Sequence, residues 1–232
     1  MVNHNLILSG GVAHDYPRTS AMLAEILAPA GIHSEICEDF QRLGAGLLSG
    51  FDLVTLNCAR WTCRQPQVSP AWRQQAGFEM SAEIQQGFAQ FLAAGKGLLA
   101  LHAATLCFDD WPAYPQILGA WWEWGHSGHA PLQEHQIRVH TDAHPVVMDL
   151  GDFAIHDELY TCPRIVDAPA PLATGEWEGE RHPVLWVRAY GPARICYCAL
   201  GHGVEAFANP SYRLLLQRGA QWVLRQLGEG GA

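Results

Sequence analysis

The sequence is poor in positive charge. Its 232 residues include 14 lysines and arginines against 23 aspartates and glutamates, which gives a formal net charge of -9, and Lys96 is the only lysine. No basic run is present that could contact nucleic-acid phosphates or anionic lipid headgroups. We therefore expect neither a nucleic acid nor a membrane surface as a partner.

Long apolar runs are also missing. No stretch reaches the roughly 18 residues that a membrane-spanning helix needs. The first residues, MVNHNLILSGG (1–11), have too short an apolar stretch for a signal peptide and lead directly into a strand-like run. These features predict a cytoplasmic protein.

Several common motifs are absent. The sequence has no Cys-x-x-Cys pair, and its seven cysteines are odd in number and widely spread. This argues against a zinc ribbon and against a secreted disulfide framework. No G-x-G-x-x-G or P-loop is present, so we expect no nucleotide cofactor, and no G-x-S-x-G elbow indicates a serine hydrolase.

The chain is 49% hydrophobic, which is enough for a sizeable core, and we interpret residues 1–232 as a single domain. Its first half alternates strand-like and helical patterns. Strands are expected at 5–11, 33–39, 52–58 and 97–104, and helices at 20–30 and 80–95. This alternation predicts an α/β fold with a mainly parallel sheet and right-handed crossovers.

The second half is richer in strand-like runs. These lie at 136–141, 153–162, 171–177, 182–191 and 193–201, with a tight turn at 190–193. A final helix is expected from Asn209 as the N-cap, with Pro210 as its first residue. The polar stretch 60–78 is predicted to be a long loop over the strand ends.

Histidines occupy places where the chain is expected to change direction. His102 follows the apolar run GLLAL (97–101), and His202 lies between two glycines. Neutral imidazole is the commonest metal ligand and the side chain best suited to move protons near neutral pH. The full set of such histidines is His14, His102, His126, His129 and His202.

The parallel sheet would bring several of these groups together. Ligands bind outside the carboxyl ends of parallel strands. His14 and Asp15 follow the first expected strand, Arg60 and Trp61 the third, and His102 the fourth. The alternative for His102 is a core histidine satisfied by a backbone carbonyl, and the alternative for His202 is an ordinary turn residue.

Two further segments carry candidate groups. If IHDELY (155–160) is a strand, His156, Glu158 and Tyr160 share one face and Asp157 points to the other. Adjacent carboxylates in an apolar strand are costly unless something binds them, so Glu158 is a candidate metal ligand or base; the alternative is a salt-bridged edge strand. In the loop GAWWEWGHSGH (119–129), the tryptophans either stack on sugar rings or pack on the core.

Together these segments resemble a known family. GLLALHAAT (97–105), LGAWWEWGH (118–126), DELY (157–160) and HPVLWVRAYGPARICYCALGHG (182–203) resemble the ThuA-like (trehalose-utilisation) family of the class I glutamine amidotransferase-like superfamily, over roughly residues 5 to 225. The resemblance implies a flavodoxin-like three-layer sandwich with added antiparallel strands. At the elbow where true amidotransferases have a catalytic cysteine, this chain has His102, so no glutaminase activity is expected.

The resemblance also implies a role in disaccharide catabolism, in which a partner dehydrogenase makes a 3-keto sugar. The ketone acidifies the neighbouring proton, and a base could remove it while a metal or an imidazolium stabilises the enolate, giving elimination or isomerisation. Such chemistry needs a divalent metal such as zinc, manganese or iron, or proton transfer by histidine. We assign His102, His126, His129 and His202 as candidate metal ligands, His102, Glu158 and His202 as candidate catalytic groups, and His14, Asp15, Arg60, Trp61, Trp122, Trp124 and Tyr160 as candidate substrate contacts.

Other functions remain open at this stage. The scaffold could serve as a non-catalytic carbohydrate- or metabolite-binding module, since a fold does not imply a function. It could also hold a metal-dependent hydrolase with Glu158 as the base. An edge strand in the second half could pair between subunits of a homo-oligomer.

Overall fold

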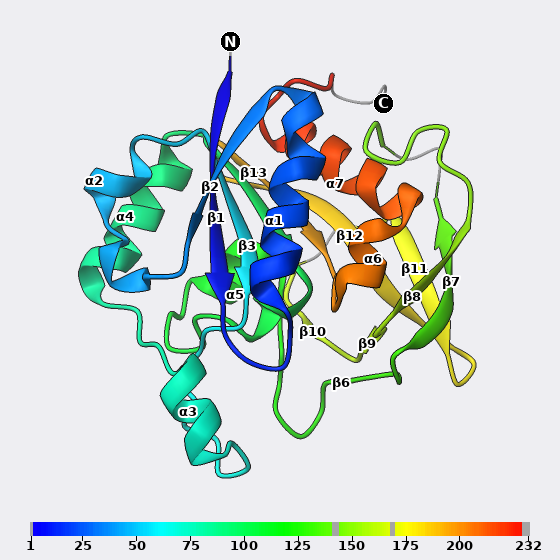
Figure 1. Cartoon of the computed structure of the whole chain (residues 1–232), viewed down its shortest axis with the longest axis horizontal. Coiled ribbons are helices and arrows are strands. Elements are labelled where there is room, and N and C mark those ends of the chain that lie inside the picture. Colours follow the sequence, from blue (N-terminus) through cyan, green and yellow to red (C-terminus); the bar gives the residue numbers. More distant parts are fainter. Residues whose placement is uncertain (1, 141–143, 168–169, 229–232) are drawn as a thin grey trace.

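The computed structural model describes residues 2–140, 144–167 and 170–228. Within them, nine strands form one mixed sheet in the order β2-β1-β3-β4-β13-β12-β11-β7-β8 (Figure 1). The parallel part consists of β2 (Ile32–Cys37), β1 (Asn3–Gly10), β3 (Leu53–Cys58), β4 (Gly97–Leu101) and β13 (Ala193–Cys198). The α/β class with a mainly parallel central sheet is therefore confirmed.

The remaining strands are antiparallel and come from the second half of the chain. They are β12 (Glu180–Tyr190), β11 (Ala173–Trp177), β7 (Gln133–Val139) and β8 (Phe153–Asp157). The predicted tight turn is confirmed, because Tyr190 pairs with Ala193 across Gly191 and Pro192. Position 141, the last residue of the expected strand 136–141, lies outside the described residues.

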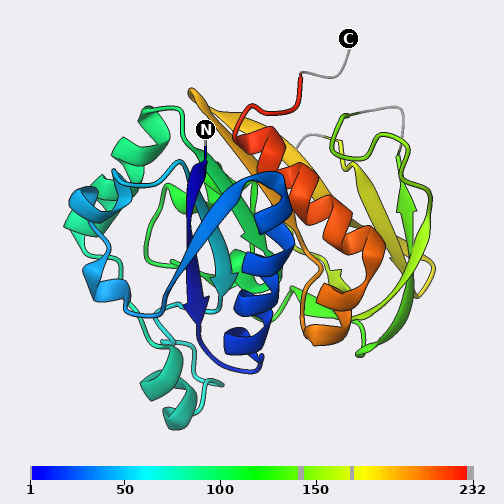
Figure 2. The same ribbon diagram turned by 45° about the horizontal axis from the view of Figure 1, so that its top comes forward.

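Helices cover both faces of the sheet. On one face lie α1 (Tyr16–Leu27), α6 (Val204–Ala208) and α7 (Pro210–Val223), and α1 packs beside α7 (Figure 2). The others are α2 (Ala45–Leu48), α3 (Pro70–Ala76), α4 (Ala82–Ala93) and α5 (Tyr114–Leu118), with short 3₁₀ turns at Ala28–Ala30, Phe40–Arg42 and His102–Leu106. Asn209 caps α7 as predicted, since its side chain accepts hydrogen bonds from the backbone N–H groups of Ser211 and Tyr212.

The strands of the parallel part are buried on both faces, as their near-continuous apolar sequences predict. Every residue of β3, β4 and β13 is buried. Cys196 and Cys198 lie in this core, and all seven cysteines are free. The packed sheet gives its carboxyl edge a rigid base for functional loops.

Two expectations about local structure are wrong. The stretch 60–78 is not loop throughout, because Ser69 caps a seven-residue helix, α3, through the backbone N–H of Trp72. The strand expected over 153–162 breaks after Asp157 and resumes as the short β9 (Tyr160–Thr161), which pairs with β6 (Gly128–His129). A second two-stranded sheet pairs β5 (Ala120–Trp121) with β10 (Arg164–Ile165).

The break has a chemical cause. The Asp157 carboxylate accepts the backbone N–H of Glu158, the next residue along the chain. His156 is exposed on β8 while Glu158 lies beyond the end of that strand. The sequence pattern predicted that His156 and Glu158 share one strand face, and this prediction is wrong.

Candidate functional site: a histidine cluster below a tryptophan wall

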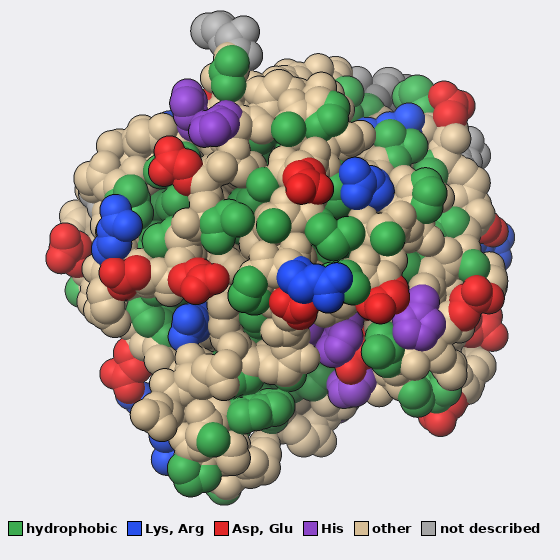
Figure 3. Space-filling model, viewed as in Figure 1, with side chains coloured by type: hydrophobic (Ala, Val, Ile, Leu, Met, Phe, Trp, Pro, Cys, Tyr) green, Lys and Arg blue, Asp and Glu red, His purple; other side chains and the backbone are tan. Residues whose placement is uncertain are grey.

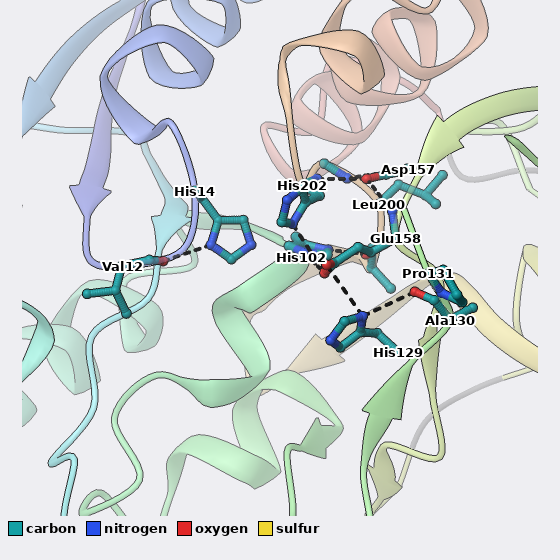
Figure 4. A network of polar contacts seen from close by, with 12 residues as sticks. Val12, His14, His102, His129, Ala130, Pro131, Asp157, Glu158, Leu200 and His202 are labelled. Carbon is teal, nitrogen blue, oxygen red and sulfur yellow. Dashed lines mark hydrogen bonds and ion pairs between the residues drawn. The ribbon is translucent and has the colours of Figure 1, made fainter. Parts of the chain in front are cut away.

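Four side chains meet at the carboxyl edge of the sheet. Here His14, His102, His202 and Glu158 are called the histidine cluster. They come from the segments after β1, β4, β13 and β8, and one ligand atom of each lies within 4.8 Å of all the others (Figure 4). Figure 3 shows histidine side chains reaching the surface at the lower edge of the molecule, where the parallel strands end.

His102 is held by backbone contacts on both sides. Its Nδ1 lies 2.7 Å from the Ala199 carbonyl oxygen, to which it donates, and its own carbonyl accepts from the Tyr197 hydroxyl at 2.9 Å. Its φ of 40° lies in the left-handed region, which is unfavourable for a non-glycine residue and persists where the surroundings enforce it. With Nδ1 used in this way, the lone pair is on Nε2, which lies 3.6 Å from Glu158 Oε2.

His14 is fixed in the same manner from the opposite side of the cluster. Its Nδ1 donates to the Val12 carbonyl at 2.9 Å and lies 3.0 Å from the Tyr16 hydroxyl. Burial, followed by the neighbouring His102, lowers the pKa of His14 to about 3. The imidazole is therefore neutral near pH 7, with a free lone pair on Nε2.

Glu158 is the acidic member of the cluster. Its Oε2 lies 3.1 Å from His202 Nδ1, and only 15% of its side chain is exposed. Burial alone would raise the pKa of Glu158, but the imidazoles of His102 and His202 outweigh burial and hold that pKa well below its ordinary range. In return, the Glu158 carboxylate beside His202 raises the pKa of His202.

Asp157 positions two of these groups, and sequence reasoning missed it. Its fully buried carboxylate accepts the backbone N–H groups of Gly201 at 2.6 Å and His202 at 2.9 Å, besides that of Glu158. Gly201 has a φ of 119°, and a Cβ there would lie 2.4 Å from the Tyr212 hydroxyl oxygen. Asp157 thus joins the loop carrying Glu158 to the loop carrying His202.

His129 and His126 differ in their placement. His129 Nδ1 lies 3.4 Å from Glu158 Oε1 and 3.1 Å from the Ala130 carbonyl, and the side chain is 46% exposed. His126 is exposed and is not among the groups that the structure gathers into the cluster. Of these two predicted metal ligands, His129 is the one beside Glu158.

A cavity of about 220 Å³ opens above the cluster, which is small beside the roughly 300–1,000 Å³ of common ligand pockets. Four indoles line it, and Trp61, Trp72, Trp122 and Trp124 are called the tryptophan wall here. Trp61 and Trp124 have ring centroids 5.9 Å apart, and Trp122 meets Tyr160 at 4.9 Å. His14, His129, Glu158, Tyr160 and His202 also line the cavity.

Two predicted substrate contacts lie elsewhere. Asp15 caps α1 through the backbone N–H of Arg18. Arg60 donates to the Gln75 carbonyl at 2.6 Å, and its guanidinium lies over the Phe40 ring. Neither side chain lines the cavity. Trp72 does line it and was missed, because the segment that carries it has no clear helical period.

The cluster has the donors that a divalent metal needs. His14 Nε2, His102 Nε2 and His202 Nδ1 are buried nitrogens that make no well-aligned hydrogen bond in the described part of the chain, and the last two face only the Glu158 carboxylate. Such orphan atoms are uncommon in folded proteins, and a bound ion is one explanation for them. The backbone bonds of His14 and His102 fix the tautomer in the way that metal-bound histidines require. Three imidazoles and one carboxylate suit zinc, manganese or iron.

The sequence profile described as "ThuA: Trehalose utilisation" matches residues 5–223. The chain belongs to the ThuA family. The match spans the segments that carry all four members of the histidine cluster. The family name links the chain to trehalose utilisation, while the chemistry has to be argued from the site.

Solved structures agree with the ThuA fold. A putative ThuA-like protein from Parabacteroides merdae is 22% identical, with a TM-score of 0.77 over 97% of this chain and 91% of that chain. A cytoplasmic protein from Salmonella typhimurium is 13% identical, with a TM-score of 0.66 over 96% and 99%. A β-galactosidase from Rahnella sp. R3 is 15% identical, with a TM-score of 0.62 over 97% of this chain but 31% of its own.

These identities are low, so the likeness concerns the fold and not the reaction. The flavodoxin-like three-layer architecture is confirmed by the sheet and by these neighbours. A comparison with curated proteins finds no match. No helix in the described residues is long and apolar enough to cross a membrane.

Proposed function

We propose that this ThuA-family protein acts on a keto sugar or keto glycoside of the trehalose type by removing the proton beside the carbonyl group. The observation that carries the proposal is the meeting of three buried imidazole nitrogens and the Glu158 carboxylate, all within 4.8 Å of one another, beside an aromatic cavity. Perturbed titratable groups in such a cavity are typical of active sites.

The histidine cluster would hold the metal through His14 Nε2, His102 Nε2, His202 Nδ1 and a Glu158 oxygen. A divalent ion there would supply Lewis-acid stabilisation of the charge that develops on the carbonyl oxygen of the substrate. Asp157 keeps Glu158 and His202 in place through their backbone N–H groups. The tryptophan wall excludes water and presents apolar faces to the sugar.

His129 is the group best placed to move the proton. It lines the cavity but is not part of the four-residue cluster, so it stays available beside the donor set. Its Nδ1 donates to the Ala130 carbonyl, which leaves the lone pair on Nε2. Glu158 Oε1, 3.4 Å from Nδ1, would stabilise the imidazolium that forms when Nε2 accepts the proton.

The subsequent step decides the product. If the C1–O bond breaks, the electrons of the former C2–H bond form a C1–C2 double bond, and the departing oxygen takes the proton back from His129. If the proton returns to C3 instead, and the C2 hydroxyl gives its proton to the C3 oxygen, the carbonyl moves to C2 and the sugar is isomerised. Both routes begin with the same proton transfer, and neither requires a cysteine nucleophile or the paired carboxylates of ordinary glycosidases.

Deuterium exchange tests this proposal directly. The purified protein, loaded in turn with zinc, manganese or iron, is incubated with 3-keto-trehalose in D₂O and followed by NMR. We expect the hydrogen on the carbon beside the ketone to be lost: it is replaced by deuterium in recovered substrate, and it is absent from the C1–C2 double bond of a cleaved product. Removal of the metal with a chelator should stop the exchange, and re-addition should restore it.

Other outcomes separate the competing functions. Cleavage that leaves the original hydrogen on the carbon beside the ketone, in both substrate and product, would favour a metal-dependent hydrolase, in which Glu158 activates water. Saturable sugar binding with neither exchange nor product would favour a non-catalytic binding module. Either result would contradict proton abstraction as the reaction.

A further inference from the structure

Trp72 differs from the other members of the tryptophan wall. Trp61 is 1% exposed, whereas Trp72 is 42% exposed even though both line the same cavity. Trp72 belongs to α3, which projects from the body of the molecule below the sheet (Figures 1 and 2). Its indole therefore stands at the mouth of the cavity, and the histidine cluster lies at the floor.

The helix that carries Trp72 is tied to the body by several polar contacts. The Arg60 guanidinium donates to the Gln75 carbonyl at 2.6 Å, and the Gln75 side-chain amide donates to the Gly11 carbonyl at 3.2 Å. Arg73 Nε donates to the Cys63 carbonyl at 3.0 Å. Gly11 precedes the loop of His14, so these bonds fix the mouth relative to the cluster.

We propose that Trp72 forms an outer subsite, which takes the neutral leaving half of the glycoside while the reacting ring lies on the histidine cluster. This inference rests on the proposed function. The cavity is lined both by members of the histidine cluster and by Trp72, so a disaccharide whose reacting ring lies on the cluster would extend its second half toward Trp72. A sugar ring there would place its C–H face against the exposed indole.

The lining also limits the charge of that second half. It contains neither lysine nor arginine, because Arg60 and Arg73 are directed to backbone carbonyls of the loop that carries α3. A phosphorylated second unit would meet no lysine or arginine side chain in the lining to balance its charge. The outer subsite thus fits an uncharged sugar or an apolar substituent.

Binding of two unoxidised glycosides tests the subsite without any turnover. Trehalose and methyl α-D-glucoside share one glucosyl unit and differ in the second half. By calorimetry we expect the metal-loaded wild type to bind trehalose about tenfold more tightly, as one good aromatic contact would give. Trp72→Ala should bring the two affinities within about twofold, and Trp72→Phe should restore part of the difference.

Trp121→Ala is the matched control. Trp121 is 37% exposed, close to Trp72, but it does not line the cavity, so its removal should leave the trehalose preference intact. The subsite is overturned if Trp72→Ala keeps the full preference, if Trp121→Ala abolishes it equally, or if the wild type binds neither sugar. Absence of exchange with 3-keto-trehalose would instead refute the proposed reaction and leave the binding result to judge the subsite.

Discussion

The histidine cluster and the tryptophan wall face the same cavity but are built in different ways. Each member of the cluster comes from a different segment and is fixed directly or through Asp157 by backbone hydrogen bonds, as with His102 on the Ala199 carbonyl. In the wall, Trp124 packs on both Trp61 and Trp122, and Trp72 stands on a projecting helix. The difference indicates that reactivity and substrate preference are separable, because a change at the wall leaves the donor atoms in place.

The largest effect is expected from removal of a ligand in the histidine cluster, which should abolish reactivity and leave substrate preference unchanged. His202→Ala deletes one of four donors, so metal content measured by mass spectrometry should fall to near zero. Deuterium exchange into 3-keto-trehalose should drop by about 10²- to 10³-fold or more, while the preference for trehalose over methyl α-D-glucoside persists.

His126→Ala is the control for that variant, since His126 is an exposed histidine outside the cluster. It should keep both metal and exchange. Full metal content in His202→Ala would show that the cluster is not the metal site. Loss of metal in both variants would point to a different ligand set that includes the loop of His126.

A smaller effect is expected at Asp157, which touches no donor atom directly. Asp157→Asn keeps the shape but turns one acceptor oxygen toward backbone N–H groups as an NH₂ donor, so the loops of Glu158 and His202 lose a shared anchor. We expect metal affinity to fall by about 10- to 100-fold, as for other groups that orient ligands. The free energy of unfolding should fall by about 1–3 kcal/mol.

Asp152→Asn is the control that distinguishes a positioning role of Asp157 at the metal site from a general effect on stability. Asp152 also accepts one backbone N–H, from Val139, but it is not a member of the cluster. This variant should lose some stability in a denaturant titration and keep its metal affinity. If Asp157→Asn lost stability alone, with metal affinity unchanged, the positioning role would be wrong.

The same contrast explains what could be predicted from sequence. The sheet was predictable because its parallel strands are continuous apolar runs and its helices carry a regular apolar period with clear caps, as at Asn209. His102 and His202 were predictable as site candidates because they directly follow such runs. The end of a strand can be predicted from the local sequence, and the histidine cluster is built from residues that follow strand ends.

The rest depends on contacts between distant segments. Arg60 follows β3 as expected, yet its guanidinium turns to the Gln75 carbonyl, a partner that only the folded chain brings near. Glu158 lies outside β8 because its backbone N–H donates to the Asp157 carboxylate and not to a neighbouring strand. Trp72 was missed since α3 has only seven residues and owes its place to tertiary hydrogen bonds.

The smallest effect is expected from the loss of one tertiary hydrogen bond that holds α3, the helix that carries Trp72. Gln75→Ala removes the amide that links α3 to the Gly11 carbonyl, while the Arg60 bond to the backbone of residue 75 remains. Because one of several hydrogen bonds is lost, we expect the preference for trehalose over methyl α-D-glucoside to fall by only about two- to fivefold.

Gln74→Ala is the control, because it changes a neighbouring exposed glutamine with no side-chain hydrogen bond in the described part of the chain, and it should have no effect. Calorimetry with both sugars measures the preference, and metal content should stay at the wild-type value in both variants. A loss of metal from Gln75→Ala would mean that wall and cluster are coupled through the loop of His14, and the separation of reactivity from preference would then fail.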